Sequence, residues 1–165
     1  MEEITAWALR LRELIVAAED LRKAVAACAG LGVAEVVALG EVWRYGPRMP
    51  SQLITRLGMT SASVTALLNR LQSAGLITRT AHPMDGRKLF VELSPAGTEL
   101  IQTLLESVAA DVATAAGVDQ SERLAELTAL MDQVSIALRT RAADRDSITE
   151  TLSRGRQTGA EPTGS

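Results

Sequence analysis

Aromatic residues are almost absent from this chain: they account for 2% of its 165 residues, although 47% of the residues are apolar. The core must therefore consist of Ala, Leu, Val and Ile, a composition that favours packed helices. The single cysteine, Cys28, excludes an intrachain disulfide and fits a reducing compartment. No stretch of about 18 consecutive apolar residues occurs, and the acidic N-terminus lacks the pattern of a signal peptide. We therefore expect a cytoplasmic protein without a membrane span.

Motifs of catalysis are also missing. The chain has one histidine, no cluster of Cys and His with metal-ligand spacing, no GxxxxGK[ST] phosphate-binding loop and no GxSxG nucleophile motif. Paired carboxylates occur only as scattered residues on predicted helix surfaces. The sequence thus predicts a protein that is not an enzyme and that has no metal or cofactor.

The charged residues are distributed unevenly, although the net charge is only −3. Residues 44–90 contain seven Lys or Arg and one acid, whereas residues 1–43 contain four and seven, and residues 91–165 contain six and twelve. A basic middle between acidic ends favours an anionic partner for the middle alone. The alternative is a chance cluster of solvated side chains.

Apolar residues recur every three or four positions in six segments, which predicts six helices. These segments are residues 3–29, 33–45, 51–57, 61–74, 95–116 and 120–142. Two short alternating segments, 76–80 and 88–93, predict strands, and the Asp85-Gly86 pair between them indicates a turn. Residues 146–165 lose the pattern and gather Gly, Thr, Ser, Arg and Pro, so we expect a largely disordered tail.

Together these elements predict a mainly α fold with a small β-hairpin wing, a six-helix winged helix-turn-helix. The short helices at 51–57 and 61–74, joined by a turn at Gly58, fit a helix-turn-helix whose second helix can enter the major groove of DNA. We assign residues 33–94 to this domain, and residues 1–32 with 95–145 to a helical dimerisation region. The terminal helices have more apolar surface than a compact winged helix covers. A second copy of the chain is therefore favoured over a monomeric bundle.

The order of these elements, with three short motifs, resembles the MarR family of bacterial regulators. The family patterns are Gly-Leu-Ile/Val-x-Arg, Asp-x-Arg at the wing, and Leu-Thr-x-x-Gly; this chain has GLITR at 75–79, DGR at 85–87 and LSPAG at 93–97. The resemblance covers residues 3–142. It implies a homodimer held by the terminal helices, with two winged lobes on a pseudo-palindromic operator in double-stranded DNA. It also implies a repressor that a small-molecule effector releases by binding between the lobes.

The second helix of the helix-turn-helix offers the candidate DNA surface, opposite its predicted core face. That surface comprises Ser61, Ser63, Thr65, Ala66 and Asn69, with Ala62 beside them. Thr65 and Asn69 can hydrogen-bond base edges, and the alanines can contact a thymine methyl. No Arg lies on this face, so we expect weak guanine readout and a larger share for A·T contacts and DNA shape. The alternative is an ordinary solvated helix surface.

The wing supplies the cationic candidates. Arg87 matches the family's Asp-x-Arg wing and is the candidate minor-groove residue, and Asp85 is expected to brace it. Lys88 and Arg79 are candidate phosphate contacts, and Arg70, on the predicted helix at 61–74, is a secondary one. Arg79 could equally be structural and pair with an acid at the base of the wing.

Three other residues bear on regulation. Trp43 and Tyr45, at the end of the second helix, are candidates for lining a ligand pocket between the lobes, although packing in the core is the favoured alternative for Trp43. Cys28 raises the alternative of a thiol-based redox sensor, although its apolar surroundings in AVAACAG favour a small buried cysteine. A further alternative is a winged-helix module that binds a protein, which would lack the steep salt dependence of DNA binding.

Overall fold

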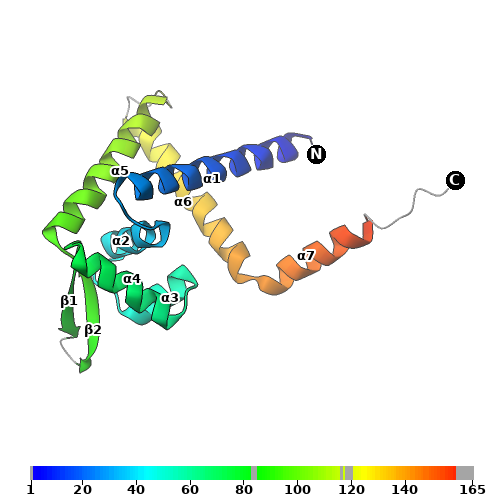
Figure 1. Cartoon of the computed structure of the whole chain (residues 1–165). Coiled ribbons are helices and arrows are strands. Elements are labelled where there is room, and N and C mark those ends of the chain that lie inside the picture. Colours follow the sequence, from blue (N-terminus) through cyan, green and yellow to red (C-terminus); the bar gives the residue numbers. More distant parts are fainter. Residues whose placement is uncertain (1, 83–84, 116, 118–120, 159–165) are drawn as a thin grey trace. The chain divides into compact units, whose positions relative to one another are not determined.

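The computed structural model describes residues 2–82, 85–115, 117 and 121–158 (Figure 1). Within these ranges the chain forms seven helices and one two-stranded hairpin. In chain order they are α1 (Glu2–Cys28), α2 (Val33–Tyr45), α3 (Pro50–Leu57), α4 (Ser61–Ser73), β1 (Ile77–His82), β2 (Asp85–Leu93), α5 (Pro95–Ala115), α6 (Ser121–Ala143) and α7 (Arg145–Thr158). The predicted mainly α fold with a hairpin wing is confirmed, and the six predicted helices begin and end within one residue of α1–α6.

Helix α7 corrects the prediction of a disordered tail, which is wrong for residues 146–158; residues 159–165 lie outside the described part of the chain. The helix is stabilised locally. Asp144 Oδ1 accepts a hydrogen bond from Ser147 N at 3.0 Å, an N-cap contact, and Arg154 pairs with Glu150 at 2.7 Å. Because α7 is mostly polar, hydrophobic periodicity could not reveal it.

The chain divides into two compact units, residues 1–107 and 108–165. Unit 1 contains the winged-helix core, to which α2, α3, α4, both strands and the start of α5 contribute. Its buried members are Ala38, Leu39, Val42, Leu53, Val64, Leu67, Leu68, Leu71, Ile77, Val91 and Ile101. All are aliphatic, as the scarcity of aromatic residues requires.

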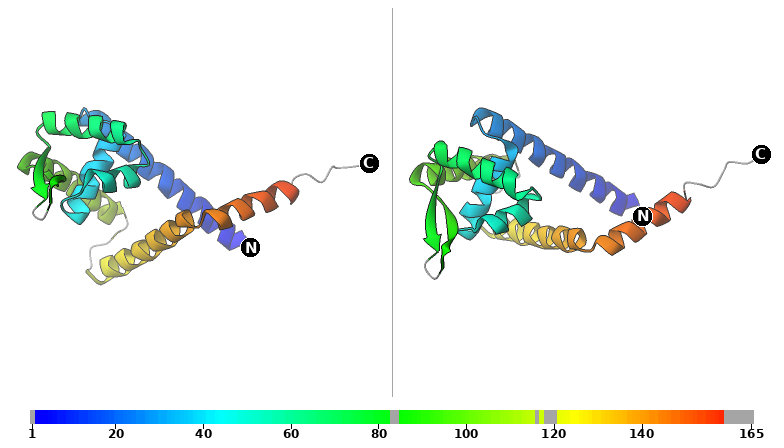
Figure 2. Two further views of the ribbon diagram at one scale, coloured as in Figure 1. Left: turned by 90° about the horizontal axis from the view of Figure 1, so that it is seen from below. Right: turned by 60° about the horizontal axis from the view of Figure 1, so that its bottom comes forward.

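The hairpin is antiparallel, with Ile77 opposite Leu93 and Thr80 opposite Phe90. A short third bridge joins it to the segment between α2 and α3. There the backbone N of Arg48 donates to the Val91 carbonyl at 3.0 Å and Val91 N donates back at 2.8 Å. The bridge fixes the base of the wing beside the helix-turn-helix, while the rest of the hairpin extends away from the helices of unit 1 (Figure 2).

The junction between the wing and α5 is closely packed. The Ser94 hydroxyl donates to the Gly75 carbonyl at 2.6 Å and accepts from Gly97 N at 3.0 Å, so Ser94 caps α5 and also contacts the turn between α4 and β1. A Cβ atom at Gly97 would lie 2.0 Å from the Leu76 carbonyl oxygen. Only glycine therefore allows this approach of α5 to the start of β1.

The terminal helices leave large apolar side chains uncovered in the single chain. In unit 1, α1 exposes 73% of Ile4 and 57% of Trp7; in unit 2, α6 exposes 64% of Ile136. No helix of the described chain is by itself long and apolar enough to cross a bilayer, and α1 with α2 reaches that criterion only as a pair bent by 100°.

Candidate nucleic-acid interface

Helix α4 separates a buried face from an exposed polar face. Its first turn is capped by Thr60, whose Oγ1 accepts a hydrogen bond from Ser63 N at 3.2 Å. The buried face is the predicted one, Val64, Leu67, Leu68 and Leu71. The exposed residues include every predicted DNA-facing position on the helix, namely Ser61, Ala62, Ser63, Thr65, Ala66 and Asn69. The polar face is therefore free of the core, as a reading surface requires.

Two hydroxyls on this face are engaged within the helix. Thr65 Oγ1 donates to the Ser61 carbonyl at 2.9 Å, and Ser63 Oγ hydrogen-bonds Thr60 Oγ1 at 2.9 Å. In this arrangement Thr65 presents an oxygen with acceptor capacity to its surroundings. The remaining amides of the first turn carry the positive end of the helix dipole, which suits a phosphate oxygen.

Asn69 and Arg79 are brought together from α4 and β1. Arg79 Nη2 donates to Asn69 Oδ1 at 2.8 Å, while Arg79 Nε is buried and has no hydrogen-bond partner among the described residues. The group that Arg79 contacts is thus an amide, not the acid considered above. The contact ties the base of the wing to the exposed face of α4.

Two ion pairs attach the helix-turn-helix to α2. Arg70 Nε on α4 lies 2.6 Å from Oε1 of the buried Glu35, and Arg56 Nε on α3 lies 2.5 Å from Glu41 Oε1. Glu35 Oε2 also accepts from Gly32 N at 2.7 Å, at the start of α2. Arg70, a predicted phosphate contact, therefore also has an internal partner that orients α4. The sequence offered no signal for these pairs, because their partners are 35 and 15 residues apart.

In the wing, Lys88 Nζ lies 3.2 Å from Asp85 Oδ2, and the Lys88 side chain is exposed. Arg87 belongs to β2, but its side chain lies outside the part of the chain that the structure describes. Its predicted bracing by Asp85 remains a prediction.

Tyr45, a predicted pocket residue, is flanked by two cations. The guanidinium of Arg48 lies 4.5 Å from the ring centroid and that of Arg44 lies 5.4 Å from it. Such cation–π contacts hold flexible Arg side chains in place. The spacing Arg-Tyr-x-x-Arg was the signal that could have identified this basic cluster.

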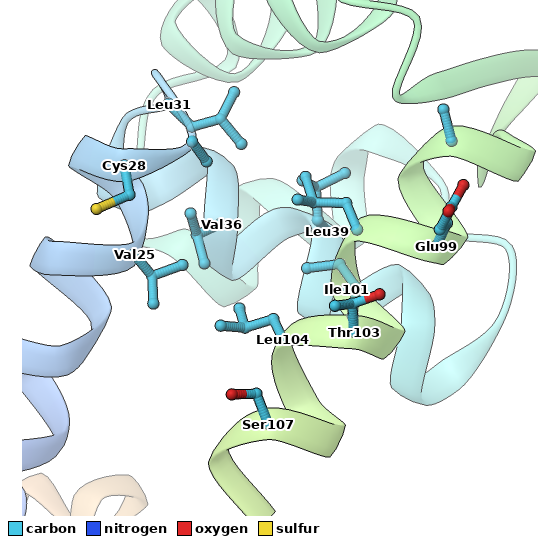
Figure 3. A pocket seen from close by; sticks show the side chains of 13 residues that line it. Val25, Cys28, Leu31, Val36, Leu39, Glu99, Ile101, Thr103, Leu104 and Ser107 are labelled. Atoms are coloured by element: carbon cyan, nitrogen blue, oxygen red, sulfur yellow. The ribbon is translucent and has the colours of Figure 1, made fainter.

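A pocket of about 620 Å³ lies within unit 1, lined by the end of α1, by α2 and by α5 (Figure 3). Its walls are mostly apolar and include Val25, Val36, Leu39 and Leu104. Neither Trp43 nor Tyr45 lines it. Trp43 borders a smaller hollow of about 240 Å³ with Pro47 and Thr98 among others.

Cys28 lines the larger pocket and is exposed, which corrects the expectation of a buried cysteine. Near its end α1 buries Ala26, but its apolar stripe as a whole is not covered within the chain. Periodicity identified the stripe without showing whether anything covers it.

Within residues 2–82, 85–115, 117 and 121–158, no group of three or more His, Cys, Asp or Glu could hold a metal ion.

Residues 29–88 match the family model of the MarR family. Over 93 residues the chain is 29% identical to the HTH-type transcriptional regulator MgrA of Staphylococcus aureus, a match that covers 56% of this chain and 62% of that protein. The chain spans between 50% and 62% of the length of the curated relatives it matches.

Solved structures share the fold over a longer range. The transcriptional regulator Tm0710 of Thermotoga maritima aligns with 84% of this chain and 98% of its own, with a TM-score of 0.64 and 22% identity. A mutant of MepR from S. aureus, solved bound to an oligodeoxyribonucleotide, aligns with 80% of this chain and 97% of its own, with a TM-score of 0.57 and 16% identity.

Proposed function

We propose that this chain, which belongs to the MarR family through its winged helix-turn-helix at residues 29–88, is a DNA-binding transcription regulator. One observation carries the proposal: α4 buries its apolar face and leaves a polar face exposed, within a segment that has seven basic residues and one acid. Most of this acidic chain would be repelled by phosphate, so the basic segment is its candidate DNA surface. The DNA-bound MepR mutant supports double-stranded DNA as the partner by analogy of fold.

In the proposed complex, α4 enters the major groove with its N-terminus toward a phosphate. Thr65 and Asn69 contact base edges, and Ala66 contacts a thymine methyl. Lys88 neutralises backbone phosphate and Arg87 reaches the minor groove, as the wing motif implies. Ser61 and Ser63, at the amino end of α4, are within the same footprint.

We propose further that the regulator is a homodimer on a pseudo-palindromic operator. The exposed apolar residues of α1 and α6, among them Ile4, Trp7 and Ile136, support a second copy as the partner that covers them. Two copies would place two reading helices about 34 Å apart, one helical turn of DNA. A protein that acts on DNA in this way belongs in the cytoplasm.

The repressor role and a small-molecule effector complete the proposal. The apolar pocket of about 620 Å³ has the size of a small-ligand site and lies against α2, whose Glu35 holds α4 through Arg70. A ligand there would change the spacing of the reading helices by favouring one of two lobe arrangements. The exposure of Cys28 at the same pocket supports the redox-sensing alternative, which oxidation with peroxide followed by a DNA-binding assay would test.

Binding to the DNA upstream of the protein's own gene tests the proposal most directly. We expect a footprint with two half-sites and an affinity whose logarithm falls linearly with the logarithm of salt concentration, as counterions are released.

The matched pair Lys88→Ala and Arg123→Ala compares an exposed wing cation with an exposed cation on α6. The salt slope should decrease by about one for K88A and stay unchanged for R123A. Salt-independent association with duplex DNA would favour the protein-binding module instead.

A further inference from the structure

Asn69 is held in one orientation by the neighbouring strand. Its Oδ1 accepts a hydrogen bond from Arg79 Nη2 at 2.8 Å, between residues that are ten positions apart. A guanidinium has five N–H donors and no acceptor, so only the oxygen of an amide can face it. The Asn69 nitrogen therefore points away from Arg79, and it carries its two N–H donors on the exposed face of α4.

This contact engages only one of the two nitrogens on that edge of the Arg79 guanidinium. Its Nε, on the same edge as Nη2, is buried and has no hydrogen-bond partner among the residues described. A carboxylate at position 69 could accept from both nitrogens, since Arg–carboxylate pairs are commonly bidentate. The chain thus carries an amide where an acid would satisfy a buried donor that is costly to leave unpaired. This choice points to a use for the amide donors that an acid could not serve.

The orientation of the amide decides which base it can read. The two-bond contact of Asn with adenine needs Oδ1 to accept from N6 while the amide nitrogen donates to N7. In this chain Oδ1 is turned toward Arg79 and keeps one further lone pair, whereas the group turned away from Arg79 is the amide nitrogen, a donor. Guanine offers two adjacent acceptors there, N7 and O6, and no donor on that edge.

We propose that Asn69 is a specificity-determining residue that donates to N7 and O6 of a guanine, and that Arg79 is the residue that positions it. This inference rests on the proposed DNA-binding function. It also reverses the expectation of weak guanine readout by α4, which considered only the absence of Arg from that face. An amide fixed as a donor reads the same two acceptors without a charge.

Selection of bound duplexes from a randomised pool tests the inference on the full-length protein. The wild type should enrich a guanine at one position of each half-site. Replacing that guanine by 7-deazaguanine, which lacks the N7 acceptor, should weaken binding about 10-fold. In Asn69→Asp the donors are gone, so the preference at that position should be lost while the other enriched positions persist. Gln72→Glu, an equal change of charge at an exposed position one turn later on α4, should keep the preference.

The positioning role of Arg79 is tested by measuring base preference in a variant that retains Asn69. In Arg79→Met the amide can rotate, so discrimination between guanine and adenine should fall although the reading residue is intact. Thermal unfolding tests the unpaired Arg79 Nε. N69D should raise Tm by about 2–4 °C, because both Nε and Nη2 of Arg79 then have a carboxylate acceptor. A merely structural role for the pair would change Tm without changing the selected sequence.

The possible outcomes separate this inference from the proposed function. If the wild type enriches a sequence but tolerates 7-deazaguanine at every position, or if N69D selects the same sequence as the wild type, the inference is overturned and DNA binding stands. If N69D lowers Tm, the account of Arg79 is overturned. If no duplex is enriched at any salt concentration, the proposed function and the inference are both overturned.

Discussion

The winged-helix core and the terminal helices use the same aliphatic residues in opposite ways. In the core, Leu67 and Val91 are fully buried within one chain, whereas on α1 and α6 Ile4 and Ile136 are 73% and 64% exposed. The first region covers its aliphatic side chains within one chain, whereas the second leaves many of them exposed. In the proposed function, reading DNA and forming a dimer therefore fall to separate surfaces, which can be altered independently.

The largest effect is expected from shortening a core side chain. Leu67→Ala should destabilise the protein by about 2–5 kcal/mol, since it removes buried apolar surface and leaves a cavity. The matched variant Leu130→Ala removes the same atoms from a residue of α6 that is 55% exposed in the single chain, and it should cost less than about 1 kcal/mol. Urea unfolding of protein dilute enough to be monomeric measures both. Equal losses would mean that α6 is packed as tightly as the core, and the comparison would fail.

Two glycine-to-alanine substitutions test how rigid the core region is. Gly97→Ala should destabilise it by about 3 kcal/mol, because the new Cβ would lie 2.0 Å from the Leu76 carbonyl oxygen and α5 must move. At Gly40, inside α2, a Cβ meets nothing within 4 Å, so Gly40→Ala should instead stabilise the helix by roughly 0.5–1 kcal/mol. Thermal unfolding of the two variants should give shifts of opposite sign. Shifts of the same sign would show that the close approach at Gly97 is easily relaxed.

A substitution in the proposed DNA face should change operator binding without changing stability. Arg87→Ala should weaken operator binding by about 1–3 kcal/mol, while its free energy of unfolding stays within about 0.5 kcal/mol of the wild type. Arg123→Ala, on α6, should leave both quantities unchanged. Binding isotherms at fixed salt, with unfolding curves for each variant, separate the two effects. An unaltered operator affinity for R87A would remove the wing from the DNA interface.

The elements themselves could be predicted because their signals are local. Thr60 caps α4 through its own side chain, and Gly75 has the left-handed φ of +71° expected at a helix end. The buried face of α4 followed from spacing alone. Helix α7 was missed for the converse reason: its stabilising contacts are polar, as at Asp144, and it lacks the apolar period on which the prediction depended.

The contacts of the site could not be predicted, because they join residues that are distant along the chain. Nothing in the sequence near Asn69 indicates that Arg79 holds its oxygen, and nothing near Arg70 indicates Glu35. The exposure of Cys28 was missed because periodicity shows where an apolar stripe lies but not whether another surface covers it. Contacts between side chains of different elements, and the burial of an apolar stripe by a partner, both depend on the assembled structure and not on local sequence.

The exposed apolar face of α6 allows a last test of the comparison. Met131, on α6, is 55% exposed in the single chain, so Met131→Glu should fold normally. If a second copy covers this face, the added carboxylate must lose its hydration there, and the dimer dissociation constant should rise at least about 10-fold, which equals about 1.4 kcal/mol. Gln133→Glu adds the same charge at an exposed polar position of the same helix and should change dimerisation little. Sedimentation velocity over a concentration series measures both variants. A wild type that stays monomeric throughout, or an M131E that dimerises as well as Q133E, would show that the apolar face of α6 is not where two copies meet.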